Sequence, residues 1–90
     1  MSRNQDVLLE HSYQVVTWDE FHNRHKFGGG GVTNDHIARA DYIRANCMDP
    51  AEKNSWVIYD PHDHGDEGLM LIGENLQELC DEAVRHLELN

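Results

Sequence analysis

The stretch SWVIYDPHDHGDEGLMLIG, residues 55–73, decides the fold. Two apolar runs, SWVIYD at 55–60 and GLMLIG at 68–73, flank the polar segment PHDHGDE at 61–67. Aromatic and β-branched residues bounded by turn formers are typical of β-strands. The stretch therefore predicts an antiparallel hairpin with a long polar loop.

A third strand is expected upstream, in SYQVVTW at 12–18, where the side chains alternate with the period of two that strands require. Thr17 then precedes Glu20 by three residues, which is the spacing of a capping box at a helix start. We expect a helix from Trp18 to about Lys26, with Trp18 and Phe21 facing the core. The four glycines that follow cannot hold a helix, so residues 28–33 are predicted to form a flexible loop.

Two longer helices complete the pattern. The segment TNDHIARADYIRANC, residues 33–47, can be capped by Thr33 or Asn34. Its apolar face is expected to hold Ile37, Ala40, Ile43 and Cys47. The C-terminal segment after Asn75 has the strongest helical periodicity of the chain, at Leu76, Leu79, Cys80, Ala83 and Leu87.

The predicted order is β-α-α-β-β-α. It indicates a small α+β protein with a three-stranded, mostly antiparallel sheet and helices packed on one face of that sheet. A length of 90 residues fits one domain, residues 1–90. Cys47 and Cys80 occupy apolar helical positions, and we interpret both as buried free thiols.

The composition is strongly acidic, with 17 acidic residues against 7 basic ones and a formal net charge of −10. This balance argues against direct binding to nucleic acid or to an anionic membrane, because both need Lys and Arg. The start of the chain has no apolar run of signal-peptide length, and no stretch is long enough for a membrane helix. We expect a soluble, cytoplasmic protein.

The charge is concentrated in the last third of the chain. Residues 1–59 hold eight acids and six bases, a net of −2, whereas residues 60–90 hold nine acids and one base, a net of −8. A concentrated field of one sign favours a partner of the opposite charge. The predicted partner-binding residues are Asp60, Asp63, Asp66, Glu67, Glu74, Glu78, Asp81, Glu82 and Glu88.

No catalytic constellation is recognisable. Ser2, Ser12 and Ser55 lack the strand–turn–helix context of a nucleophile elbow. The glycine run lacks the Lys-Ser/Thr pair of a phosphate loop. We therefore expect neither an enzyme nor a bound cofactor.

The histidines of the hairpin loop support an alternative hypothesis, a zinc or nickel site. His62, His64 and Asp66 carry ligand atoms that such metals accept, and His22 and His25 could complete the set if the loop folds over the first predicted helix. An EF-hand does not fit, because its twelfth position is Leu71 where a bidentate Glu is required.

The sequence thus favours a small, acidic, non-enzymatic inhibitor that mimics nucleic acid and binds a basic nucleic-acid-binding protein. By size and charge it compares with phage or mobile-element anti-defence proteins of the anti-CRISPR or anti-restriction type. Metal binding by the hairpin loop is the alternative. A weaker alternative is an aromatic binding patch made by Trp18, Phe27 and Tyr42.

Overall fold

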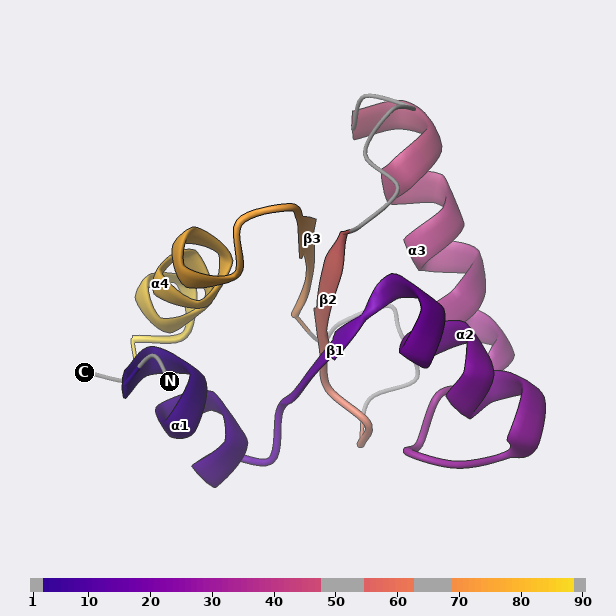
Figure 1. Cartoon of the computed structure of the whole chain (residues 1–90), viewed down its shortest axis with the longest axis horizontal. Helices are drawn as coiled ribbons and strands as arrows, with labels where there is room; N and C mark the ends of the chain where they lie inside the picture. The colour runs from indigo at the N-terminus through magenta and orange to yellow at the C-terminus, as the bar shows by residue number, and fades with distance from the viewer. Residues whose placement is uncertain (1–2, 48–54, 63–68, 89–90) are drawn as a thin grey trace.

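The computed structural model describes residues 3–47, 55–62 and 69–88. Its elements, in the order α-β-α-α-β-β-α, are α1 (Arg3–Glu10), β1 (Gln14–Thr17), α2 (Trp18–Phe27), α3 (Asn34–Cys47), β2 (Trp56–Tyr59), β3 (Met70–Gly73) and α4 (Leu76–Leu87). The α+β class and the three expected strands are confirmed (Figure 1). Among the described residues no helix is long and apolar enough to span a membrane.

The sheet has the order β1-β2-β3, and both pairings are antiparallel. Strand β2 lies in the middle, with Ile58 opposite Val15 on one side and Leu71 on the other. The predicted hairpin of β2 and β3 is therefore correct. Strand β1 passes without a loop into α2, and the amide of Trp18 still bonds to the carbonyl of Ser55 at 2.8 Å.

Helices cover both faces of this sheet, so the expectation that they pack on one face is wrong (Figure 1). Val57 and Tyr59 of β2 point into a core that also contains Phe21 of α2 and Ala40 of α3. Ile58, between them, points into a second core. Because successive strand side chains face opposite ways, a strand covered on both faces becomes a continuous apolar run, which WVIY is.

The second core depends on α1, a helix that the sequence analysis did not anticipate. Leu8 is fully buried there and packs against the buried residues of α4, Leu79, Cys80, Ala83 and Val84. Helix α1 has only eight residues, and a helix of that length is marginal without tertiary contacts. Packing against α4 therefore decides its formation.

The predicted helix starts are confirmed. The hydroxyl of Thr17 accepts from the amide of Glu20 at 3.2 Å, and Oδ1 of Asn75 accepts from the amide of Glu78 at 3.0 Å. Thr33 caps α3 by accepting from the amide of His36 at 3.3 Å. These bonds satisfy amides that a helix start leaves without partners.

The glycine run follows a defined path from α2 to α3. Gly28 has a φ of 75° and ends α2 as a left-handed C-cap, a conformation that suits glycine. The carbonyl of Gly30 then accepts a bond of 2.6 Å from the hydroxyl of Tyr59, and Val32 is buried. The loop is therefore docked on the end of the central strand.

Candidate functional site

The sheet separates the charged residues of the helices into two unequal layers. Helices α1 and α4 together hold five acidic side chains and two basic ones. Helices α2 and α3 hold four of each and are neutral as a pair. Because α1 and α4 lie on one side of the sheet and α2 and α3 on the other (Figure 1), the helices that cover the two faces of the sheet differ in net charge.

We call the α1–α4 side the acidic layer. Its solvent-exposed acidic residues, counting Glu74 and Glu88 next to the helix ends, are Asp6, Glu10, Glu74, Glu78, Glu82 and Glu88. In the described part of the chain, the carboxylates of Glu74, Glu78 and Glu88 make no hydrogen bond or ion pair. The structure thus exposes four of the nine predicted partner-binding residues in one layer.

Two other predicted residues have structural contacts of their own. The carboxylate of Asp81 is only partly exposed and accepts a hydrogen bond from the side-chain amide of Asn4, which ties α4 to α1. The carboxylate of Asp60 accepts from the amide of His62 at 2.9 Å, in the turn after β2. Asp63, His64, Asp66 and Glu67 lie outside the described residues.

The acidic layer also carries a histidine and an arginine on α4. Nε2 of His86 lies 3.7 Å from Oε1 of Glu82, one turn earlier on α4. Arg85 is exposed next to this pair, and the three residues line a shallow depression.

The histidines predicted as metal ligands on α2 have separate partners. Nε2 of His22 lies 3.7 Å from Oδ1 of Asp41, whereas Nε2 of His25 lies 2.6 Å from the side-chain oxygen of Asn34. Among residues 3–47, 55–62 and 69–88, no three His, Cys, Asp or Glu side chains are grouped as metal ligands. In the described residues, His22 and His25 therefore do not belong to a common group of metal ligands.

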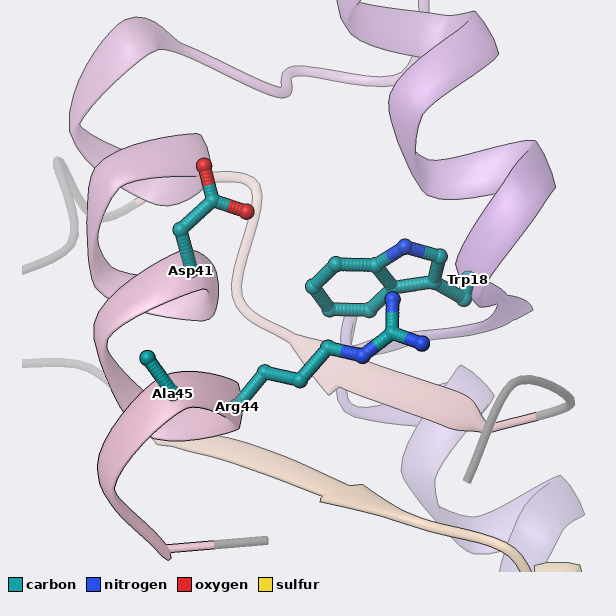
Figure 2. A pocket seen from close by; sticks show the side chains of 4 residues that line it. All are labelled: Trp18, Asp41, Arg44 and Ala45. Atoms are coloured by element: carbon teal, nitrogen blue, oxygen red, sulfur yellow. The ribbon is translucent and has the colours of Figure 1, made fainter. Parts of the chain in front are cut away.

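A cleft of about 310 Å³ lies between α2 and α3, lined by Trp18, Asp41, Arg44 and Ala45. Figure 2 shows the Arg44 guanidinium beside the indole of Trp18, with Asp41 one turn earlier on α3. The guanidinium carbon is 4.4 Å from the ring centroid, a cation–π distance. The cleft combines an aromatic surface with both signs of charge.

The three aromatics proposed as one patch are dispersed. Trp18 lines the α2–α3 cleft, while Phe27 lines a separate hollow with Glu20, Asn23, Arg24 and Gly29. Phe27 is nine positions after Trp18 on α2, which places the two side chains on opposite sides of the helix. Phe27 and Tyr42 are 78% and 66% exposed, so neither is a core residue.

The polar contacts of His36 and Arg24 were not predicted from the sequence. His36 is fully buried, and its ring nitrogens contact the amide of Thr33 at 3.0 Å and the carbonyl of Asp60 at 2.9 Å. Arg24 contacts the side chains of Glu20, Gln14 and Tyr59. The Arg24–Glu20 spacing of four residues was a readable helical signal, whereas the contacts from β1 and β2 depend on tertiary structure.

Comparison with known proteins gives no relative: no family model, no curated protein sequence and no solved structure matches this chain.

Proposed function

We propose that this protein is a non-enzymatic binding domain that contacts a basic protein through its acidic layer. The unequal charge of the two helical layers is the observation that supports this function. A net charge of −10 by itself indicates only solubility or a general preference for cations. Among the described residues, most of the acidic excess lies on the α1–α4 side of the sheet, which gives the molecule a face that a basic partner would meet first.

The acidic residues of α4 add a second argument. Glu78 and Glu82 are one helical turn apart, about 6 Å along the axis, and both are exposed. Like charges at this spacing destabilise a helix by a few tenths of a kcal/mol. Among the described residues, no cationic side chain pairs with Glu78 to offset this repulsion. Such a surface suits a partner that supplies the positive charges.

The more specific proposal is nucleic-acid mimicry. Carboxylates arrayed along α4 would occupy the basic groove where the partner otherwise binds phosphates. In this proposal the partner is a nucleic-acid-binding protein of a defence system, such as a CRISPR effector or a restriction enzyme, and the chain belongs to a phage or mobile element. Size and charge are the support for this setting.

The first experiment is a pull-down from host lysate with the tagged full chain, at low and moderate salt, read by mass spectrometry. We expect one basic nucleic-acid-binding protein to be recovered, and to be released by salt or by competing duplex DNA. Recovery of a partner that DNA does not displace would contradict mimicry while leaving the binding function intact.

The acidic layer is then tested with two double variants that change the charge equally. Glu78→Gln with Glu82→Gln alters α4, and Asp19→Asn with Asp35→Asn alters exposed residues of the neutral layer. We expect the first variant to weaken binding at least about tenfold and the second to leave it within about twofold. Equal losses would show that net charge alone matters, and no loss in the first variant would refute the assignment of this face.

A further inference from the structure

The register of the sheet shows which backbone groups point to which neighbouring strand. The amide of Trp18 bonds to the carbonyl of Ser55, so these two residues form a hydrogen-bonded pair next to the β1–β2 ladder. Hydrogen-bonded pairs come at every second residue of an antiparallel ladder. The backbone groups of Val57 therefore point to β1, and those of Ile58 point to β3.

The same alternation fixes the outer edge of β3. Leu71 lies opposite Ile58, so these two residues exchange hydrogen bonds. The amides and carbonyls of Met70 and Ile72 then point away from β2. Within the described ranges no strand pairs with this side of β3, and no other group bonds to these amides and carbonyls. The outer edge thus presents donors and acceptors that a further strand could pair with.

This edge lacks the features by which edge strands usually avoid pairing, which are charged side chains, proline and bulges. Strand β3 has the sequence MLIG and pairs with β2 in continuous register. The side chains of Leu71 and Ile72 are only partly buried. The opposite edge differs, because β1 contains the polar residues Gln14 and Thr17 and passes directly into α2. Strand β3 is therefore the edge suited to accept another strand.

Acidic side chains border this edge on the α4 side. Leu79 of α4 lies over Gly73, since a Cβ on Gly73 would be 3.2 Å from Cδ1 of Leu79. Glu82 is three residues after Leu79, so it lies on the same side of α4, and it is exposed. Glu74, also exposed, directly follows β3. A second copy of this chain would bring the same carboxylates to the edge and be repelled, whereas a cationic segment would be attracted.

We propose that the outer edge of β3 binds an extended segment of the basic partner as an additional strand of the sheet. Main-chain hydrogen bonds supply affinity in this binding mode, and alternate side chains supply specificity. On the α4 face the segment carries Lys or Arg, which meet Glu74 and Glu82. On the other face it carries apolar residues, which lie beside Met70 and Ile72. This inference rests on the proposed binding of a basic protein and adds how that protein is held.

The test uses the full chain and, as a probe, a capped peptide of alternating Lys and Val. Amide hydrogen exchange measured by NMR reports on single residues. In the free protein, the amides of Met70 and Ile72 should exchange at least about tenfold faster than that of Leu71. Saturating peptide should slow both at least about tenfold and leave Leu71 within about twofold. A peptide with proline in place of valine keeps the charge but cannot pair as a strand, and should protect neither residue.

Two proline variants locate the site. Ile72→Pro removes an outward amide of β3 and leaves the hydrogen-bonded pairs with β2 in place. Val15→Pro is the matched control, since it makes the same change on the outer edge of β1. We expect Ile72→Pro to weaken peptide binding at least about tenfold and Val15→Pro to leave it within about twofold. Thermal melting verifies that each variant is folded, and if Ile72→Pro is not, hydrogen exchange of the unaltered chain decides.

Three outcomes would overturn the proposal. Peptide binding that leaves Met70 and Ile72 unprotected would refute the edge as the site and leave the proposed function standing. Protection of these amides without peptide, increasing with protein concentration, would assign the edge to a second copy of the chain. If neither cationic peptide binds, the edge proposal is wrong, and the effect of Glu78→Gln with Glu82→Gln on partner binding decides the proposed function separately.

Discussion

The hydroxyl of Tyr59 donates a hydrogen bond of 2.6 Å to the carbonyl of Gly30 and accepts one of 3.2 Å from Nη1 of Arg24. Tyr59 is fully buried at the end of the central strand. This one atom therefore joins β2, the glycine run and α2. The hydrogen bond with Tyr59, followed by that with Glu20, raises the pKa of the Arg24 guanidinium against the opposing effect of its burial.

Removing this hydroxyl should destabilise the fold. Tyr59→Phe removes the hydrogen bonds to the Gly30 carbonyl and from Arg24 and should cost about 1–3 kcal/mol, at roughly 0.5–1.5 kcal/mol for each hydrogen bond lost. Tyr42→Phe is the matched control, since Tyr42 is largely exposed. Calorimetric melting should show a drop of several degrees for the first variant and little change for the second. Equal melting temperatures would refute the role assigned to Tyr59.

Two adjacent leucines test the packing of α1. Leu8 is completely buried against α4, whereas Leu9 is 43% exposed. Leu8→Ala should cost about 2–5 kcal/mol, the range for a large core side chain replaced by alanine. Leu9→Ala should cost less than about 1 kcal/mol. Urea unfolding measures both, and similar values would mean that α1 does not pack as described.

The glycine run offers a second matched pair. Gly31 has a φ of 71°, and a Cβ there would lie 2.6 Å from Cβ of Pro61. Gly29 lies in open space. Gly31→Ala should therefore destabilise by about 1–3 kcal/mol, while Gly29→Ala should be neutral or slightly stabilising. If Gly31→Ala melts at the temperature of the unaltered chain, the loop is not docked against Pro61.

Cys80 should be an unreactive thiol. Burial, with a smaller contribution from the Asp81 charge, raises the pKa of this thiol. In a Cys47→Ser background, a thiol reagent at pH 8 should label the folded protein much more slowly than the urea-unfolded protein.

The raised pKa of Cys80 also makes the free energy of unfolding depend on pH. The folded state holds the Cys80 proton more tightly than the unfolded state, so this contribution is complete below the ordinary thiol pKa. It is lost as the pH rises through the folded-state value. Rapid labelling of folded protein at pH 8 would contradict the burial of Cys80.

Local patterns predicted the elements correctly where a few neighbouring residues decide the structure. The caps at Thr17 and Asn75 act within one turn, and the apolar stripe that places Leu79 and Ala83 inward needs only helical geometry. Helix α1 was not predicted because its few apolar residues are buried only by contact with α4, about 70 positions later in the chain. His36 was missed for the same reason, since Asp60 is distant in sequence.

The candidate sites show the same division. The excess of acid in the last third of the chain was readable from composition, but the sequence could not show that Asp81 would bond to Asn4. It also suggested that His22 would act with His25, whereas the structure brings His22 to Asp41. Side chains three residues apart on a helix can share a face, yet their partners come from whatever element packs there.

The sequence by itself determined the strands of the hairpin, the helix starts and the strong negative charge, because propensity, capping and composition act over short distances. The tertiary structure alone decided that helices cover both faces of the sheet, that the acidic residues of α1 and α4 share one layer, and that His22 meets Asp41. Each of these depends on burying apolar side chains far apart in the chain, and burial depends on which elements meet rather than on local order.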